Sequence, residues 1–214
     1  MRTALFGGSF NPVHVGHLAI AEAARDGLRL DRVLLVPCAR PPHKDAPDLA
    51  PGRDRLAMIR LALRGRPGLG VSAVELRRRG PSYTIETVKT FRAAARRRRG
   101  ADAGRGGRET LYLLVGADML ADLPRWREAE RLVRRVRVAA AGRPGWSLAP
   151  IRRALVRAFG AAFVRGLDCR RFDAPRIDVS STAIRRRARA GRSLRGLVPD
   201  AVAAYIRKRG LYRR

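Results

Sequence analysis

The sequence predicts a single α/β domain in which helices wind over both faces of an open parallel sheet. Two patterns predict this class: short apolar runs alternate with segments in which apolar residues recur at helical spacing, and several of the runs end at glycine or proline. The length of 214 residues, 46% of them hydrophobic, is enough for one sizeable core and fits one large domain better than two small ones. We therefore expect residues 1–214 to form one unit.

The first half of the chain opens with a strand, a tight loop and a helix. The apolar run 2–6 stops at the pair Gly7 and Gly8, and apolar residues recur at helical spacing from Gly16 onward. The next run, 31–37, is continuously apolar, as is typical of a strand covered on both faces.

A loop rich in proline and charge covers 41–52 and precedes a second helix, which we expect to turn Leu56, Ile59 and Leu63 inward. Residues 70–74 then indicate a third strand. The first half is thus predicted to be β-α-β-α-β.

A third helix is expected to begin near Thr84, with Ile85, Val88 and Phe91 on its apolar face. Residues 93–108 are biased in alanine, arginine and glycine, which predicts a frayed helix end followed by a flexible surface loop. A solvated insertion is favoured there over a basic loop that contacts RNA.

The second half repeats the alternation. The run 110–115 is a strong strand that ends at Gly116, residues 132–141 predict a helix followed by a strand, and 151–159 predict a helix. A short strand at 177–180 is expected to lead into helical residues, so that 181–214 form a helical C-terminal part. This order favours right-handed crossovers and a Rossmann-like, doubly wound sheet.

The charge is strongly basic, with 47 Lys and Arg against 18 Asp and Glu and a formal net charge of +29. Such a balance raises nucleic-acid binding. The arginines, however, are spread along the whole chain, and with only 6% aromatic residues no stacking platform is visible. We expect small-molecule substrates and no specific nucleic-acid partner.

Membrane and thiol chemistry are not indicated. No apolar run approaches the roughly 18 residues of a membrane span, and no signal-peptide pattern opens the sequence, so we expect a cytoplasmic protein without a membrane partner. Cys38 and Cys169 lie far apart and outside any CxxC or Cys/His spacing, which favours reduced thiols over a disulfide or a metal site.

Ligands of such sheets bind beyond the carboxyl ends of the strands, and the loop at 7–17 has the richest chemistry there. Its glycines let a backbone approach a ligand, and His14 and His17 lead into a helix N-terminus, which together favour phosphate oxygens. Standard phosphate-loop motifs are absent, and histidines that only cap or pack the helix are the alternative. A metal pair is disfavoured because no third ligand lies nearby.

A second cluster lies at 180–185, where hydroxyl groups at a helix start are followed by Arg185 one turn later. Helix N–H groups, hydroxyls and a guanidinium make an anion cradle. An ordinary Ser/Thr cap with a surface arginine is an equal alternative on these residues alone.

GGSFNPVHVGHL and VSSTAIR resemble the two signatures of the nucleotidylyltransferase superfamily, and the resemblance runs nearly end to end. The further segments RPPHK, SYTIET, LLVGADML and AGRPG, with Trp126, are similar to bacterial nicotinate-nucleotide adenylyltransferases. The departures are the Arg/Gly-rich stretch and the basicity, and neither touches a motif residue.

The resemblance implies transfer of the adenylyl group of ATP to nicotinate mononucleotide in NAD biosynthesis, with release of pyrophosphate. It places at ATP Gly7, Gly8, Ser9, Phe10, His14, His17, Gly116, Asp118, Ser181, Thr182 and Arg185. At the pyridine nucleotide it places Lys44, Tyr83, Thr84, Trp126 and Arg143. Mg²⁺ is expected to bridge the triphosphate, held mainly by substrate oxygens and water.

Four of these residues, His14, His17, Lys44 and Arg185, are the catalytic candidates, with His17 at the α-phosphate and Arg185 at the β- and γ-phosphates. Asp118 would accept from ribose hydroxyls and Trp126 would stack on the pyridine ring. A helix cap for the aspartate, a core position for the tryptophan and a solvated Lys44 are the alternatives.

Two other functions compete. Another adenylyltransferase of the superfamily would accept phosphopantetheine or nicotinamide mononucleotide, and an Arg-rich RNA-binding module would use a degenerate version of the fold. The intact histidines argue against degeneration. The sequence leaves a homo-oligomer open.

Overall fold

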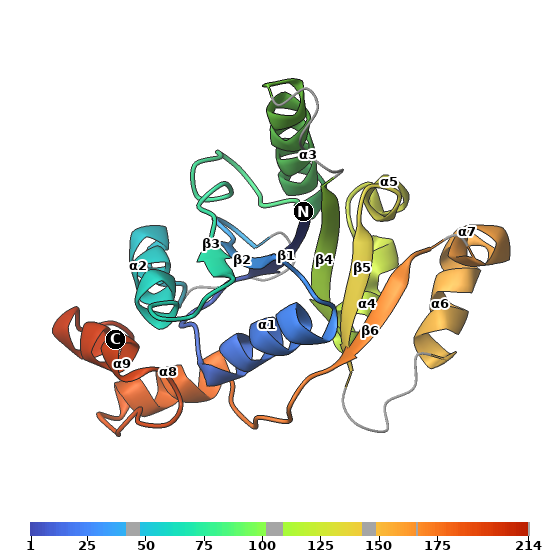
Figure 1. Ribbon diagram of the computed structural model, residues 1–214. Coiled ribbons are helices and arrows are strands. Elements are labelled where there is room, and N and C mark those ends of the chain that lie inside the picture. The colour runs from blue at the N-terminus through green and yellow to red at the C-terminus, as the bar shows by residue number, and fades with distance from the viewer. Residues whose placement is uncertain (42–47, 102–108, 143–148, 166, 214) are drawn as a thin grey trace.

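The computed structural model describes residues 1–41, 48–101, 109–142, 149–165 and 167–213, with the side chains of 99–101, 117, 118 and 151 excepted. All six strands of the sheet are parallel, in the order β3-β2-β1-β4-β5-β6 (Figure 1). The strands are β1 Arg2–Gly8, β2 Arg32–Pro37, β3 Leu69–Val71, β4 Thr110–Gly116, β5 Arg137–Gly142 and β6 Cys169–Asp173.

Helices connect the strands and extend beyond the last of them. They are α1 Val15–Gly27, α2 Gly52–Ala62, α3 Thr84–Ala101, α4 Ala117–Asp122, α5 Ala129–Val133, α6 Ala149–Phe159, α7 Ala161–Arg165, α8 Ser181–Arg189 and α9 Asp200–Lys208, with a 3₁₀ turn η1 at Leu123–Arg125. In the described parts of the chain, no helix combines the length and apolarity needed to cross a membrane.

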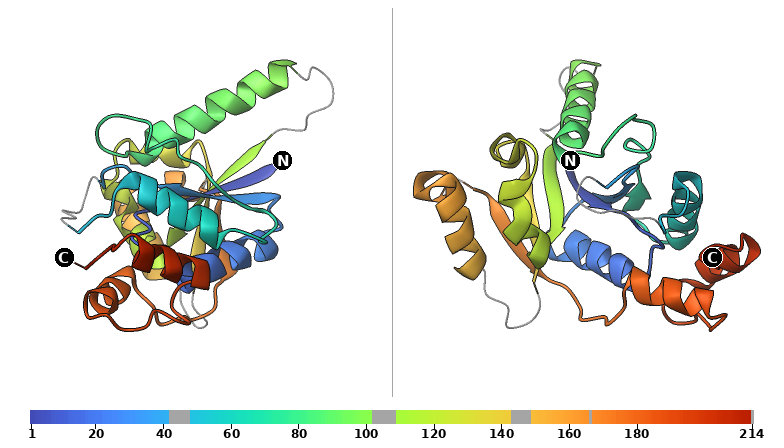
Figure 2. Two further views of the ribbon diagram at one scale, coloured as in Figure 1. Left: turned by 90° about the vertical axis from the view of Figure 1, so that its left-hand side faces the viewer. Right: turned by 180° about the vertical axis from the view of Figure 1, so that it is seen from behind.

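Two hydrophobic cores cover the two faces of the sheet, as the predicted doubly wound class requires. Neighbouring residues of one strand point to opposite cores: Ala4 packs with α1, α2, α8 and α9, whereas Leu5 packs with α3 to α7. The two layers are visible on either side of the sheet in Figures 1 and 2. The expected Rossmann-like α/β fold is therefore confirmed.

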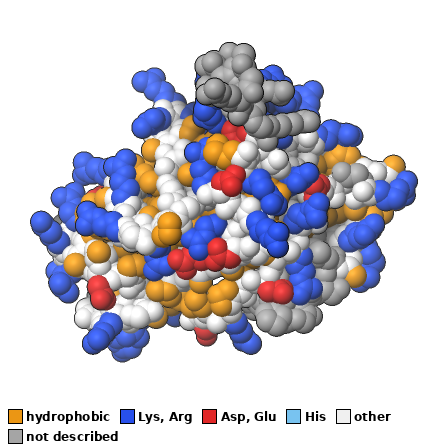
Figure 3. Space-filling view, in the orientation of Figure 1, with side chains coloured by type: hydrophobic (Ala, Val, Ile, Leu, Met, Phe, Trp, Pro, Cys, Tyr) orange, Lys and Arg blue, Asp and Glu red, His pale blue; other side chains and the backbone are white. Residues whose placement is uncertain are grey.

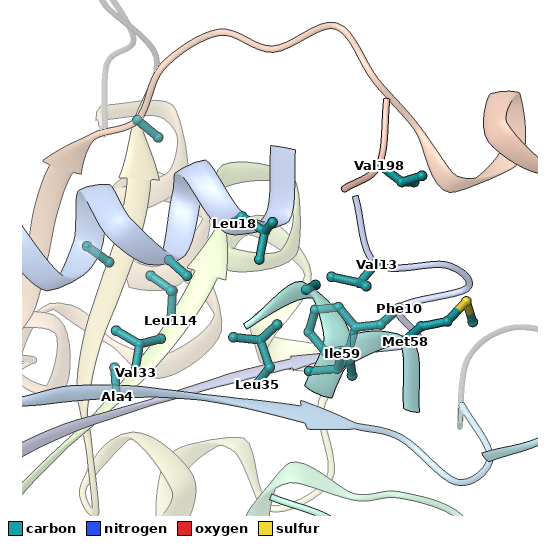
Figure 4. Packing of buried hydrophobic residues seen from close by; sticks show 14 of the residues in the cluster. Ala4, Phe10, Val13, Leu18, Val33, Leu35, Met58, Ile59, Leu114 and Val198 are labelled. Carbon is teal, nitrogen blue, oxygen red and sulfur yellow. The ribbon is translucent and has the colours of Figure 1, made fainter. Parts of the chain in front are cut away.

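The first core also joins the two ends of the chain. Val198, between α8 and α9, lies beside Val13 in the loop after β1 (Figure 4). The N–H of Val15 donates to the carbonyl of Leu197 at 3.1 Å. The C-terminal helices are thus packed against the loop that contains the two histidines.

The last strand was predicted at the wrong place. It is Cys169–Asp173, paired in parallel with β5, whereas 177–180 form an extended connection outside the sheet. In β6 only Phe172 is buried, because this strand lies at the sheet edge. Its sequence, CRRFD, therefore lacks the apolar pattern on which the prediction relied.

The helix end expected within 93–108 lies at Ala101, because residues 93–101 continue α3. Alanine and arginine are good helix formers, so the local preference of this segment supports the helix. Figure 2 shows the end of α3 projecting past the strands. Residues 102–108 lie outside the described residues.

Two smaller differences concern α2 and β3. The buried face of α2 consists of Asp54, Arg55, Met58, Ile59 and Ala62, so only Ile59 of the predicted three is fully inside. Leu56 and Leu63 are half-buried. β3 spans Leu69–Val71 and is shorter than the predicted 70–74.

Candidate active site

The sheet order reverses between β1 and β4, and a cavity of about 600 Å³ lies at the carboxyl ends of these strands. This is the place where open α/β sheets bind ligands, and the volume suits a small organic molecule. The expected residues that line it are Gly7, Gly8, Ser9, His17, Tyr83, Thr84, Gly116 and Trp126. One cavity is therefore lined both by the loop after β1 and by the residues predicted at the pyridine nucleotide.

His14 and His17 cap α1 together. The ring of His14 accepts from the N–H of His17 through Nδ1 at 3.4 Å, and the ring of His17 accepts from the N–H of His14 through Nδ1 at 3.2 Å. The two rings stack with their centroids 3.6 Å apart. Because each Nδ1 is an acceptor, the proton of each neutral ring is on Nε2, which can donate to a ligand.

Burial keeps both rings uncharged. Desolvation lowers the pKa of His14 to about 4, and desolvation together with the neighbouring His14 lowers the pKa of His17 to about 3. At neutral pH the pair consists of two oriented hydrogen-bond donors without a net charge. The capping alternative and the ligand role are thus compatible, since capping uses Nδ1 and leaves Nε2.

Gly16 makes this stack possible. A Cβ at this position would lie 3.0 Å from Cγ1 of Val179 and 3.2 Å from Nδ1 of His14. The glycine between the two histidines therefore allows close packing of α1 against both the imidazole and the C-terminal segment.

Phe10 is a buried residue that packs against the glycine and histidine of the loop. Its ring is 1% exposed and meets the rings of Phe6 and His17 edge to face, at centroid distances of 5.6 and 5.0 Å. A Cβ on Gly8 would lie 3.1 Å from Cζ of Phe10. The phenyl ring is thus part of the core beneath the glycines, and only the backbone of Phe10 remains for a contact with ATP.

The C-terminal cluster is bonded directly to the first loop. Ser181 Oγ donates to the carbonyl of Pro12 at 3.0 Å, and Arg185 Nη1 donates to the carbonyl of Asn11 at 3.1 Å. The cap of α8 is Ser180, which accepts from the N–H of Ala183 at 3.1 Å. The ordinary-cap alternative therefore accounts for Ser180 and leaves Ser181 and Arg185 at the loop.

Arg185 retains an unused donor. Its Nη2 lies 3.4 Å from Oγ1 of Thr182, but its Nε is buried and has no hydrogen-bond partner among the residues that the structure describes. A buried guanidinium N–H without an acceptor is costly. This observation favours an anionic ligand at Arg185.

Asn11, Arg55 and Tyr212, which we did not predict, hold the loop after β1 in place. The amide of Asn11 accepts from Ala50 N–H at 3.0 Å and from the Tyr212 hydroxyl at 2.9 Å. Arg55, 1% exposed, donates to the carbonyls of Ser9 at 2.8 Å and Ala50 at 2.9 Å. In a chain with 47 basic residues, nothing local distinguishes this arginine from the exposed ones.

The pyridine side centres on the start of α3. Tyr83 N–H already donates to the carbonyl of Pro81 at 3.1 Å, so Thr84 N–H, for which the described residues provide no backbone acceptor, is the better donor to a ligand. The guanidinium of Arg127 covers the Tyr83 ring at 4.7 Å. Trp126 is half-buried and lines the same cavity, so it is not a pure core residue.

Some expected residues cannot be placed. Lys44 and Arg143 lie outside the described residues, and for Asp118 only the backbone, in the first turn of α4, is described. Asp122 and Met119, on the same short helix, line the cavity and were not predicted. Both cysteines are free thiols, and the described residues contain no group of three or more His, Cys, Asp or Glu side chains that could hold a metal ion.

The fold and the site define a Rossmann-like α/β protein with a cavity at the point where the sheet order reverses, lined by a loop of glycines and His17, as expected of a nucleotidylyltransferase. A family model described as "Cytidylyltransferase-like" matches residues 5–187. A relative from Roseiflexus sp. (strain RS-1), named "Probable nicotinate-nucleotide adenylyltransferase", is 44% identical over 98% of this chain and 96% of its own. A relative of the same name from Thermus thermophilus is 42% identical over 100% of both chains. The chain belongs to the cytidylyltransferase-like family and, within it, to the nicotinate-nucleotide adenylyltransferases.

Solved structures agree on the fold. The nicotinic acid mononucleotide adenylyltransferase of Plasmodium falciparum, in its complex with NaAD, superposes with a TM-score of 0.71 at 16% identity, covering 99% of this chain and 97% of its own. A structure described as a putative nicotinate-nucleotide adenylyltransferase from Vibrio parahaemolyticus gives a TM-score of 0.67 at 16% identity, covering 99% of this chain and 95% of its own. At this level of identity the likeness concerns the fold alone.

Proposed function

We propose that this protein transfers the adenylyl group of ATP to nicotinate mononucleotide, forming nicotinate adenine dinucleotide and releasing pyrophosphate. The observation that carries the proposal is the shared cavity in which His17 and the glycines of the first loop face the same space as Thr84 and Trp126. A dinucleotide product requires such continuity, because its two halves are joined inside one site.

The reaction needs no protein nucleophile. A 5′-phosphate oxygen of the mononucleotide attacks the α-phosphorus of ATP in line, a new P–O bond forms, and the bond to the bridging oxygen of pyrophosphate breaks on the opposite side. The nucleophile is already ionised at neutral pH. Catalysis then depends on position and on stabilising charge at the phosphoryl oxygens.

The histidine pair stabilises that charge as neutral donors. Nε2–H of His17, which lines the cavity, donates to an α-phosphate oxygen, and His14 holds the His17 ring in place by stacking and capping. Because the backbone bonds at Nδ1 fix the rings before the substrate arrives, little reorganisation is needed in the transition state.

Arg185, with Ser181 and Thr182, is assigned to the β- and γ-phosphates. Its buried Nε is the donor that remains unused without ligand. The guanidinium also ties the site to the loop through the carbonyl of Asn11. Charge on the departing pyrophosphate would be neutralised at this end of the site.

Mg²⁺ belongs to the proposal as an ion bound to the triphosphate of ATP. The described residues offer no cluster of carboxylates, which fits an ion held by phosphate oxygens and water. The ion would neutralise phosphate charge, and the protein would bind the resulting complex through the donors described above.

On the acceptor side, Trp126 stacks on the pyridine ring and the N–H of Thr84, next to Tyr83, donates to the carboxylate of nicotinate. Lys44 and Arg143 are assigned to the phosphates, and Asp118 to a ribose. We keep the cytoplasm as the proposed location, because the substrate ATP is used there.

Pyrophosphate release tests the proposal directly. Wild-type protein is given ATP and Mg²⁺ with nicotinate mononucleotide, nicotinamide mononucleotide or phosphopantetheine in parallel. We expect the nicotinate substrate to be preferred, and His17→Ala to lower kcat by roughly 100- to 1,000-fold, as the loss of one oriented donor does in other enzymes. Asp26→Ala, an exposed change at the other end of α1, is the matched control and should retain activity.

Other outcomes would redirect the assignment. Turnover only with phosphopantetheine or nicotinamide mononucleotide would show that the enzyme is an adenylyltransferase of the superfamily with a different acceptor substrate. Absence of turnover together with RNA binding of steep salt dependence would contradict the enzyme and support a binding module.

A further inference from the structure

A buried carboxylate lies at the pyridine end of the cavity. Glu75, in the connection between β3 and α3, is 6% exposed and lines the cavity together with Ser82, Thr84 and Thr87. Neither the proposed chemistry nor the substrate contacts assigned above use it. Burial raises the pKa of Glu75, while hydrogen bonds from Thr87 and Ser82 and the charge of Arg78 oppose that shift.

One hydroxyl group donates to the carboxylate and a second lies close to it. Thr87 Oγ1 donates to Oε1 of Glu75 at 2.6 Å, and the Ser82 hydroxyl is near enough to lower the pKa of the carboxyl group. Ser82 Oγ itself accepts from the N–H of Ala39 at 2.9 Å. Because Ser82 Oγ is an acceptor in that bond, its hydroxyl proton remains available to donate to Glu75.

These bonds connect three segments that meet at the cavity. Ser82 and Thr87 flank the start of α3, where Thr84 has the N–H assigned to the nicotinate carboxylate. Through Ala39 N–H, and through Ser82 N–H, which donates to the carbonyl of Arg40 at 3.0 Å, the network reaches the loop after β2. Glu75 is therefore in a position to hold the start of α3 in place through Ser82 and Thr87, the residues on either side of Thr84.

Burying a charged group costs desolvation free energy. A buried ion pair can often be replaced by well-packed apolar residues without loss of stability, so a buried charge is weak evidence for a role in stability. A carboxylate does provide two oxygens that only accept, so that two hydroxyls can be oriented toward it at once. This carboxylate is thus suited to orient the segment.

We propose that Glu75 is a positioning residue for the pyridine mononucleotide, which acts through Ser82 and Thr87 to fix the Thr84 N–H and thereby sets the preference for the acid over the amide. The inference rests on the proposed function. A fixed N–H donates a charge-assisted hydrogen bond to either oxygen of a carboxylate, whereas an amide offers it only one neutral carbonyl oxygen. A loosened segment positions the N–H less well and so loses part of this preference.

Glu75→Gln tests the role, because it keeps the shape but has one acceptor oxygen and a donor NH₂, so that one hydroxyl must turn away. We expect KM for nicotinate mononucleotide to rise about 10-fold and KM for ATP to stay within about 2-fold. The ratio of kcat/KM for the nicotinate over the nicotinamide substrate should fall by about 10-fold.

Ser82→Ala breaks the same network with less risk to folding, since it removes only a hydroxyl. It should shift the two KM values in the same pattern. In the double variant with Glu75→Gln the rise in KM should be smaller than the product of the single effects, because both changes break one network.

Glu109→Gln is the matched control. Glu109 also accepts from a threonine hydroxyl, Thr3 Oγ1 at 2.9 Å, but it lies at the amino end of β4, away from the cavity. It should leave both KM values and the selectivity unchanged.

The inference is wrong if Glu75→Gln leaves selectivity unaltered, if KM for ATP rises equally, or if Glu109→Gln has the same effects. A wild-type protein that does not use nicotinate mononucleotide would instead contradict the proposed function. The two failures are therefore distinguished by the wild-type assay.

Discussion

At the scale of residues, the site depends on groups whose protonation and orientation are fixed before a ligand arrives. His14 and His17 are neutral because they are buried, and their donors are oriented because the backbone occupies each Nδ1. Two imidazolium ions 3.6 Å apart would repel each other strongly. Neutral rings can stack at this distance and still bind phosphate oxygens.

The lowered pKa values predict acid sensitivity. Unfolded histidines bind protons below their ordinary pKa of 6.5, whereas the folded pair stays neutral until pH approaches 4. The unfolded state therefore binds more protons in this window, and the free energy of unfolding falls as the pH drops from 6.5 toward 4, by at least about 2 kcal/mol.

Urea unfolding at a series of pH values between about 7.5 and about 4 measures this slope. His17→Gln, which keeps a polar side chain without a titrating ring, should give a shallower slope than the wild type. A slope unchanged by this substitution would show that other groups cause the acid sensitivity.

At the scale of elements, α2 is unusual because it buries an arginine. Arg55 links the helix to the carbonyls of Ser9 and Ala50, and thus to the phosphate loop. Burial lowers the pKa of its guanidinium, which shows the cost of this position, and no acidic side chain within the described residues forms an ion pair with it. The hydrogen bonds to the backbone carbonyls offset that cost.

Loss of this link should destabilise the protein. Arg55→Met leaves the two carbonyls without a donor, and we expect the free energy of unfolding to fall by about 2–4 kcal/mol. Arg55→Lys, which restores one donor, should recover part of the loss. Arg60→Met, on the exposed face of the same helix, is the control and should change stability by less than about 0.5 kcal/mol. Equal effects at both positions would contradict the structural role of Arg55.

Elements also differ in how clearly the sequence indicates them. β1, β2 and β4 lie inside the sheet and are apolar on both faces, so their runs are visible in the sequence. β6 has a single buried residue, Phe172, and was placed wrongly. The end of α3 lacks a regular apolar face and was predicted as a frayed helix end followed by a loop, although its residue types favour a helix.

At the scale of the whole molecule, the positive charge is the dominant feature. Lys and Arg side chains are scattered over the face seen in Figure 3 and are not collected in one stripe. A net charge of +29 on one domain repels itself in the folded state. The anionic triphosphate of ATP is attracted by the same field.

Ionic strength should therefore affect stability and binding in opposite directions. On raising NaCl from about 20 to 300 mM, where the Debye length falls from about 20 to 6 Å, we expect the Tm to rise and KM for ATP to increase. Differential scanning calorimetry and initial rates measure the two effects. A Tm that falls with salt would show that attractive ion pairs outweigh the repulsion.

The class of the fold, the loop of glycines and histidines and the second signature at 181–185 could be predicted from the sequence, because each depends on patterns within short stretches of the chain. Periodicity and short motifs are local features, so they can be recognised without knowing which residues pack together. The expected strand–loop–helix at the first loop is present, with β1 at Arg2–Gly8 and α1 at Val15–Gly27.

Contacts between distant segments became visible only once the chain was folded. Arg185 contacts Asn11 across 174 positions of sequence and Ser181 contacts Pro12 across 169, so the second signature lies against the first loop. The tertiary structure also assigned a structural role to Arg55 and placed Glu75 beneath the start of α3. Contacts between distant segments and the burial of a charged side chain depend on the packing of the whole chain, and no local pattern encodes them.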